Sequence, residues 1–244
     1  MPAEPATGRS SGPFGYYIAD PKHGPLPALL LLLTIVTGLV DAASILALGR
    51  VFVANMTGNV VFVGFALAGA PGFSLAGSIF ALIGFLVGAF GGGAAITRMS
   101  VHRGRLLRDT ATAECVLFVV AVIIAITTAP MGTSARVGVA FVLAVALGLQ
   151  NTSVRRLAVP DLTTTVLTMT LTGIAADIRQ SSYAVAARRA LSVLCMFVGA
   201  VVGAVLVLHV NVQTPLAIAA ALAGIVAIEA AAASRQPAAW HDSS

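Results

Sequence analysis

The residue best placed to do chemistry is Asp41, which stands inside an apolar stretch between Pro27 and Leu48. If this stretch crosses a membrane, an acidic side chain within it is costly unless it is paired, hydrated or protonated. Two interpretations follow from that cost. Asp41 is either an ion or proton site, the usual role of an intramembrane carboxyl group, or a structural acceptor of hydrogen bonds from nearby backbone.

Asparagine and threonine side chains gather at the polar start of two shorter apolar segments, Val51–Ala70 and Leu162–Ile178. Such side chains cap the free N–H groups at the start of a helix. The positive end of the helix dipole lies there too and favours an anionic group, and the two roles are compatible. The candidate substrate- or ion-binding residues are therefore Asp41, Asn55, Thr57, Gly58, Asn59, Asn151, Thr165, Thr168 and Thr170.

Other residues with catalytic or ligating chemistry are dispersed. Cys115 and Cys195 lie in separate apolar stretches, and the four histidines fall in tails, a loop and a helix end. This leaves no ligand set with the spacing of a zinc site and no acid–base pair beside a nucleophile. We therefore predict that the protein is not an enzyme and that it binds no metal and no cofactor.

Three further acidic residues are expected at the edges of the membrane rather than inside it. Glu114 and Glu229 are predicted to lie near helix ends and to reach the interface. Asp177 is predicted to pair with Arg179 at the surface, because the two stand close together at the end of an apolar segment.

The composition indicates the environment of the chain. Hydrophobic residues make up 58% of its 244 residues and charged residues only 9%, and the mean hydropathy is +0.98. Soluble domains carry about 25% charged residues, so this chain could not cover its own surface in water. The sequence predicts an all-α integral membrane protein whose partner is the lipid bilayer. The net charge of +5 sits mostly in short loops, and no motif indicates a nucleic-acid partner.

Six segments are long enough to span a bilayer, which needs about 20 mostly apolar residues. They are Pro27–Leu48, Phe73–Ile96, Thr112–Thr128, Val137–Gln150, Ala190–Val210 and Pro215–Ala232. They form a single transmembrane domain over residues 27–233. Residues 1–26 and 234–244 are predicted to be cytoplasmic tails, the first of them disordered because it is rich in proline, glycine, serine and charge.

The distribution of basic residues decides how the two shorter segments lie. If both segments cross the membrane, seven basic residues lie on each side. If both enter and return on the same side, only Arg50 and Arg136 face out, and twelve of the 14 basic residues face the cytoplasm. We therefore predict six transmembrane helices plus two re-entrant strand/half-helix elements, with both termini cytoplasmic.

The polar entry to each re-entrant segment indicates where its helix begins. We expect Val51–Asn55 and Leu162–Thr165 to be extended, with helices that start near Thr57 and Thr168. An unbroken spanning helix through residues 55–59 would contradict this prediction.

The two halves of the chain resemble each other at a constant spacing. The matching positions are Gly38–Asp41 with Gly148–Asn151 (offset 110), and Thr57 with Thr168, Val87–Ala89 with Val198–Ala200 and Gly92 with Gly203 (offset 111). Because each repeat contains three crossings, the second is inverted, which gives a 3+3 arrangement of about 27–130 and 135–233. Transporters often use inverted repeats with broken helices and bind their solute near the midplane.

Glycines mark the expected close contacts. Gly38 and Gly148 fall at the middle of their helices, where we expect each to admit the tip of a half-helix in close backbone contact. The stripes Gly84–Gly92 and Gly199–Gly203 are expected to be packing seams between helices, and they are compatible with a homo-oligomer.

At these motifs the sequence resembles the YoaK family of bacterial membrane proteins, which carry a domain of unknown function. The resemblance covers about residues 27–233 and is strongest at Thr37–Ala42, at Gly49–Asn59 and at the threonine-rich stretch Pro160–Thr168. It implies a compact protein of the bacterial inner membrane. The family pattern places a glycine after the last threonine of the second signature, where this chain has Met169. We expect this difference to alter the second half of any site.

Taken from the residues, the leading function is transport of a small solute or ion, coupled to protons through Asp41. A channel is the nearest alternative, because re-entrant half-helices that meet at the midplane also build pores. A third hypothesis is a membrane sensor or scaffold that transports nothing, in which the repeats only form a stable helix bundle.

Overall fold

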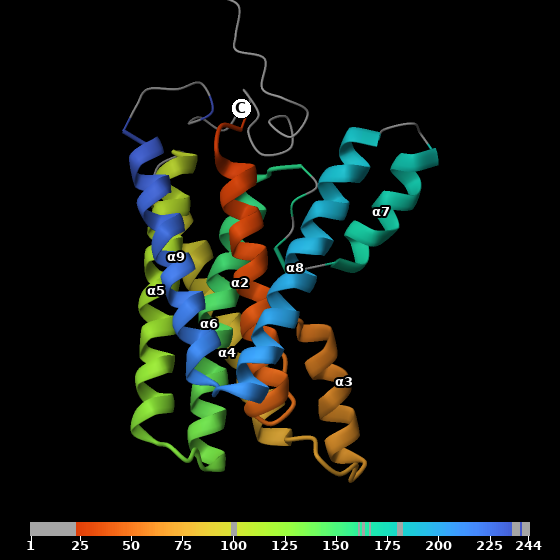
Figure 1. The fold of residues 1–244 in the computed structure, drawn as a ribbon, viewed down its shortest axis with the longest axis vertical. Helices are drawn as coiled ribbons and strands as arrows, with labels where there is room; N and C mark the ends of the chain where they lie inside the picture. Colours follow the sequence, from red (N-terminus) through yellow and green to blue (C-terminus); the bar gives the residue numbers. More distant parts are fainter. Residues whose placement is uncertain are drawn as a thin grey trace, which may run out of the picture.

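The computed structural model describes residues 23–98, 102–160, 162, 164–165, 167–179, 183–235 and 240. Within them the chain forms eight helices (Figure 1). They are α2 (Leu26–Ala47), α3 (Met56–Leu67), α4 (Leu75–Arg98), α5 (Arg103–Thr127), α6 (Thr133–Leu157), α7 (Leu167–Arg179), α8 (Tyr183–His209) and α9 (Gln213–Ala233).

Two classes of helix follow from length and composition. The helices α2, α4, α5, α6, α8 and α9 are each long and apolar enough to cross a membrane. The other two, α3 and α7, have 12 and 13 residues. At about 1.5 Å per residue they reach only about 20 Å, which is short of a hydrocarbon core of about 30 Å. The prediction of an all-α membrane fold with six long apolar helices is confirmed.

Several helices run past their apolar part. The predicted span Thr112–Thr128 lies within α5 except for its last residue, which caps that helix, and Val137–Gln150 lies inside α6. The start of α5 is set by His102, whose ring nitrogen accepts the backbone N–H of Arg105 at 3.3 Å. The basic stretch that the sequence suggested as a loop is therefore the first turns of a helix.

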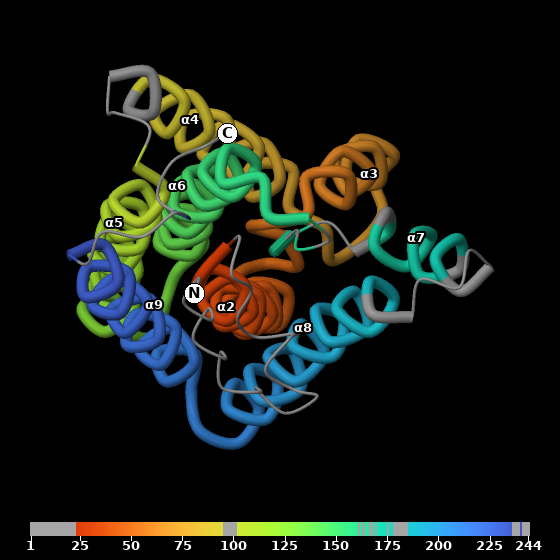
Figure 2. The backbone as a smooth tube through the Cα atoms, turned by 90° about the horizontal axis from the view of Figure 1, so that it is seen from above, coloured from red at the N-terminus to blue at the C-terminus, as the bar shows by residue number. Residues whose placement is uncertain are grey.

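The helix α2 stands at the centre of the bundle, with α5, α6, α8 and α9 around it (Figure 2). The most extensive packing joins α4 to α6, α2 to α8, and α5 to α9. The core beside α2 includes Val36 and Val40, which pack with Leu143, Leu147 and Leu216. This central place makes α2 the element that holds Asp41 inside the protein.

Glycines bring two of these helix pairs into backbone contact. A Cβ atom at Gly38 would overlap the Met196 carbonyl oxygen of α8, and one at Gly148 would overlap the Phe85 carbonyl oxygen of α4. The prediction that Gly38 and Gly148 are close-contact positions is confirmed. The expected neighbour was wrong, because each glycine meets a long helix rather than a half-helix tip. A long helix offers several turns of continuous packing, which a tip does not.

The path through α3 begins and ends at the same end of the bundle. Gly49, which follows α2, lies beside Ser74, which precedes α4. The Arg50 guanidinium lies against Gly72. Figure 1 shows α6 and α8 joined in the same way through α7, at the opposite end. The expected strands are absent from the described residues of both entry segments, which are irregular loops. No neighbouring strand is available there, and side chains take the place of a strand's hydrogen-bond partners.

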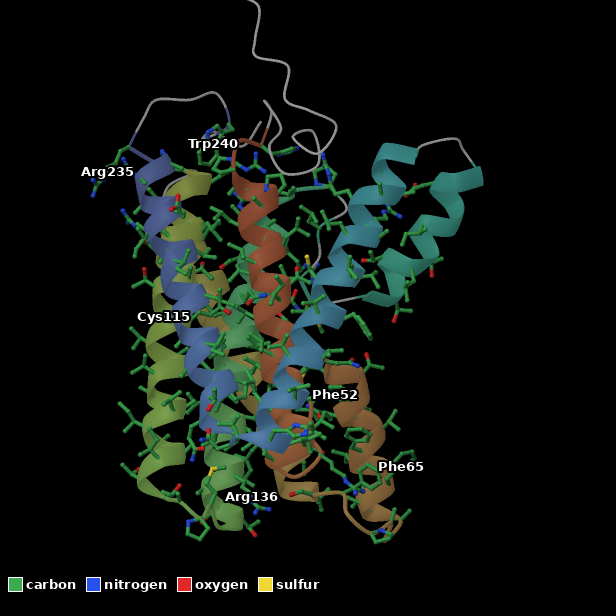
Figure 3. All side chains as sticks on the ribbon, viewed as in Figure 1. Phe52, Phe65, Cys115, Arg136, Arg235 and Trp240 are labelled. Atoms are coloured by element: carbon green, nitrogen blue, oxygen red, sulfur yellow. The ribbon has the colours of Figure 1, made fainter. Side chains whose placement is uncertain are left out.

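The two ends of the bundle differ in charge. Figure 3 shows Arg235 and Trp240 at one end and Arg136 at the other. At the first end Arg103 is buried and donates hydrogen bonds to the Leu157 carbonyl oxygen and the His23 ring. These contacts tie the start of α5 to the end of α6 and to the chain before α2.

Candidate functional site

A cavity of about 590 Å³ lies where both short helices begin, between α2, α4, α6 and α8. The lining residues are Asp41, Phe52, Ala54, Asn55, Met56, Thr57, Gly58, Val61, Phe62, Phe85, Asn151, Thr165, Thr168 and Met196. Seven of the nine predicted binding residues are in this set: Asp41, Asn55, Thr57, Gly58, Asn151, Thr165 and Thr168. The structure thus brings together residues that stand more than a hundred positions apart in the chain.

Asp41 holds the loop before α3. Its Oδ1 atom accepts the backbone N–H groups of Val53 at 3.1 Å and Ala54 at 3.2 Å. The side chain is 7% exposed and lines the cavity. Oδ1 therefore has the structural role that the sequence suggested for Asp41, as an acceptor of hydrogen bonds from nearby backbone. The role of an ion or proton site is left to the other carboxylate oxygen, Oδ2, which is free of hydrogen bonds within the described part of the chain.

Asn59 lies outside the cavity lining and has a structural role. Its Oδ1 accepts the Phe52 N–H at 2.9 Å, and its Nδ2 donates to the Phe52 carbonyl oxygen at 2.6 Å. The side chain is fully buried. Together with Asp41, it satisfies the polar backbone of the loop over residues 52–54, which a segment at membrane depth requires.

The start of α3 is capped by Asn55, whose Oδ1 accepts the Gly58 N–H at 3.4 Å. The absence of a side chain at Gly58 lets the Phe52 ring pack against it, because a Cβ would overlap that ring. The predicted helix starts near Thr57 and Thr168 are confirmed to within one residue, at Met56 and Leu167. In Figure 1 these two N-termini meet at mid-height of the bundle.

The second entry segment is held by a residue that the sequence did not single out. Gln150 is fully buried, and its Nε2 donates to the hydroxyl groups of Thr37 on α2 (3.2 Å) and Thr164 before α7 (2.7 Å). It precedes Asn151, and Thr164 precedes Thr165, so both cavity residues are positioned by this bridge. Thr170 is buried and outside the lining.

Sequence reasoning did not predict the apolar lining residues, which are Phe52, Ala54, Met56, Val61, Phe62, Phe85 and Met196. Phe85 and Met196 are the two that lie on long helices. Each stands three residues before a repeated glycine, Gly88 on α4 or Gly199 on α8. The repeat could have indicated both residues, because each lies on the same helix face as a glycine of the repeat, three positions before it.

The prediction for Glu114 was wrong. Glu114 lies in the middle of α5 rather than at its end, is fully buried, and has no hydrogen-bond partner among the described residues for either carboxyl oxygen. The prediction followed from polar residues 108–112, which continue the helix instead of ending it. Asp177 forms its ion pair with Arg189 of α8, at 3.3 Å. The Arg179 side chain lies outside the described residues. Glu229 is exposed near the end of α9, as expected.

Some expectations fall outside the described residues. They concern most of the tails 1–26 and 234–244, residues 161, 163 and 166, and the Met169 side chain. Among the residues that are described, no three His, Cys, Asp or Glu side chains gather as a metal site would require.

Residues 29–228 match the model of a family described as "Protein of unknown function (DUF1275)". The chain belongs to the DUF1275 family. It is similar to the UPF0700 transmembrane protein YoaK of Bacillus subtilis (strain 168), with 31% identity over 153 residues. That match covers 62% of this chain and 66% of the relative. The YoaK resemblance seen in the sequence is thereby confirmed. No solved structure matches the chain.

This DUF1275 protein therefore combines six long apolar helices with a cavity that both halves line. The family match runs from within α2 to within α9, so it includes every element that contributes to the cavity.

Proposed function

We propose that this DUF1275 protein transports a small solute or ion, which binds in the cavity between its two halves. The observation that carries the proposal is the pairing of the lining residues. Asp41 and Asn151 are 110 positions apart, and Thr57 and Thr168, like Phe85 and Met196, are 111 apart. Each half contributes the equivalent position to the same cavity, which is the arrangement of a transporter with a site between inverted repeats.

Helix packing supports the inverted repeat itself. The offset between the halves makes α2 equivalent to α6 and α4 equivalent to α8. The contact of α2 with α8 therefore corresponds to the contact of α6 with α4. At the glycines the agreement extends to single neighbours. Gly38 meets Met196 and Ala200, whereas Gly148 meets Phe85 and Ala89, and these neighbours are again 111 apart. A bundle without internal symmetry gives no reason for such correspondence.

Geometry also supports re-entrant membrane elements and a common side for both termini. The helices α3 and α7 are too short to cross, and each returns the chain to the end of the bundle that it left. Of the arginine side chains that the structure describes, Arg50 and Arg136 lie at one end, while the others stand in the helix turns toward the opposite end: Arg103, Arg105, Arg108, Arg155, Arg156, Arg188, Arg189 and Arg235. By the positive-inside rule the second end faces the cytoplasm of a bacterial inner membrane.

The decisive experiment is solute flux in proteoliposomes that contain the purified protein, with and without a pH gradient. We expect saturable flux of a small solute that exceeds the flux through protein-free liposomes and responds to the gradient. Saturation separates a transporter from a channel, in which flux continues to rise with concentration.

Two tryptophan variants test whether the flux passes through the cavity, one that blocks the cavity and one that serves as its control. Thr57→Trp should abolish flux because the large side chain fills the space between α3 and α7, whereas Val60→Trp on the exposed face of α3 should leave it unchanged. Equal flux through both variants, or no flux above liposomes for any solute class, would refute a transport role for this cavity.

A further inference from the structure

The charge of the cavity is the first indication of what it binds. Among the lining residues that the structure describes, Asp41 is the only ionisable side chain. An anionic ligand would therefore meet a carboxylate with no basic partner, and like charges repel strongly in an environment of low dielectric constant. This argument disfavours carboxylates, phosphates and sulfates as ligands.

The two oxygens of Asp41 divide their roles. Oδ1 accepts both loop N–H groups, and among the described residues Oδ2 accepts none. A structural carboxylate would gain from a donor on each oxygen, and neither Thr57 nor Asn55, which line the same cavity, donates to Oδ2. The bare oxygen in a cavity wall is instead suited to a ligand that brings its own donor and positive charge.

Part of the remaining wall is apolar and aromatic, and the rest carries the hydroxyl and amide groups of Asn55, Thr57, Asn151, Thr165 and Thr168. Phe52 and Phe62 stack with ring centroids 5.5 Å apart, and Phe85 and Met196 line the cavity beyond them. Aromatic faces attract a cation within about 6 Å of the ring centroid. The rings offer apolar contact to the organic part of such a cation, whereas a metal ion would bind through oxygen ligands alone and gain nothing from them.

The helix N-termini set the strength of binding. Each contributes a partial positive charge of about half a unit, which offsets the Asp41 anion in the empty cavity. This makes a carboxylate tolerable at this depth without a permanent basic partner. The same partial charges also limit the affinity for a cation. A limited affinity suits a transporter, because a transporter must release the solute that it binds.

Resting on the proposed transport function, we propose that the ligand is a small organic cation, with its ammonium group at Asp41 Oδ2 and its apolar part against the phenylalanine rings. The probes are ethylammonium and tetramethylammonium, compared with propionate and with uncharged propanol. Binding to the purified protein in detergent is measured by calorimetry, and flux is measured separately in proteoliposomes.

Asp41→Asn separates charge from structure, because the asparagine Oδ1 can still accept the Val53 and Ala54 N–H groups. We expect thermal stability close to that of the wild type and about tenfold to hundredfold weaker binding of the cation probes, the loss of one charged hydrogen bond. The double variant with Asp41→Asn and Asn151→Asp moves the carboxylate to the equivalent wall, and we expect it to recover most of the binding. Val60→Ala, on the exposed face of α3, should leave binding unchanged.

The outcomes distinguish this inference from the transport proposal. Cation probes that bind through Asp41 but do not cross the liposome membrane would support the ligand class and refute transport. Flux of propionate or propanol without binding of the cations would support transport and overturn the ligand class. Unchanged cation binding in Asp41→Asn would also overturn it.

Discussion

At the scale of single residues, the loop before α3 shows how polar backbone is maintained among apolar helices. Asp41 and Asn59 supply acceptors and a donor to residues 52–54, where a strand partner would otherwise be needed. Asn59 is fully buried and lies outside the cavity lining, whereas Asp41 also lines the cavity. Both were predicted as binding residues from their type and their place in the sequence, and these two signals cannot separate the roles.

Replacing Asn59 with alanine should therefore destabilise the protein. The Phe52 N–H and carbonyl oxygen would both lose their partner, which costs about 1–3 kcal/mol in a buried position. The melting temperature in detergent measures the effect. Val60→Ala serves as the matched control, because Val60 is the next residue on α3 and is 61% exposed. An unchanged melting temperature in Asn59→Ala would show that the loop does not depend on this clamp.

Glu114 allows the opposite prediction. Its carboxyl group is fully buried in α5, and neither oxygen has a hydrogen-bond partner within the described residues. Replacement by leucine removes two desolvated polar atoms, so we expect a gain of about 1–3 kcal/mol in the free energy of unfolding. Glu229→Leu should change stability little, because Glu229 is exposed near the end of α9. A loss of stability in Glu114→Leu would instead show that the carboxyl group has a partner that forms only in the membrane.

At the scale of elements, glycine decides which helices meet. Backbone contact between α2 and α8 requires Gly38 and Gly199 to face each other, and α4 and α6 meet at Gly88 and Gly148 in the same way. Without side chains between them, the helix backbones approach more closely than larger residues allow, and packing contacts replace the hydrophobic effect that lipid cannot supply.

Gly38→Ala should disturb this contact. The new Cβ would overlap the Met196 carbonyl oxygen, and overpacking of this kind costs about 1–3 kcal/mol. Gly91→Ala on α4 is the control, since a Cβ there meets no atom within 4 Å of its position in the structure. We expect the control to be neutral or slightly stabilising, by up to about 1 kcal/mol, from higher helix propensity. Equal melting temperatures for both variants would contradict the close packing of α2 and α8.

Much of this element level could be predicted from the sequence. Hydropathy located the six long helices, and the polar starts located α3 and α7, because both signals are local. The neighbours of Gly38 and the bridge by Gln150 could not be predicted, because they depend on which helices pack together. Glu114 was misplaced for a related reason. A polar turn was taken as a helix end, although α5 continues through it.

At the scale of the whole molecule, the six long helices alternate in direction while α3 and α7 enter from opposite ends and meet in the middle (Figure 1). The cavity lies where these two helices begin. If it binds a transported solute, that solute would need access from each side in turn, and the two short helices have the fewest neighbours among the described helices.

The proposed orientation can be tested by labelling single cysteines in a variant with Cys115 and Cys195 replaced by alanine. Ser134→Cys at the start of α6 should react with a membrane-impermeant maleimide in intact cells, whereas Ala232→Cys in the last turn of α9 should react only after permeabilisation. Both positions are exposed, and neither change alters the charge that sets topology. The reverse pattern would invert the orientation, and labelling of both sites in intact cells would disprove six crossings.

The short sequence distance between Asp41 and its partners has a consequence for biogenesis. The N–H groups that Asp41 accepts lie only 12 and 13 residues further along the chain, whereas α8, its helix's main packing neighbour, is made more than 130 residues later. The carboxylate can thus be covered as soon as the first loop has entered the bilayer. During synthesis α2 does not have to wait in lipid with a bare charge for the second half of the protein to arrive.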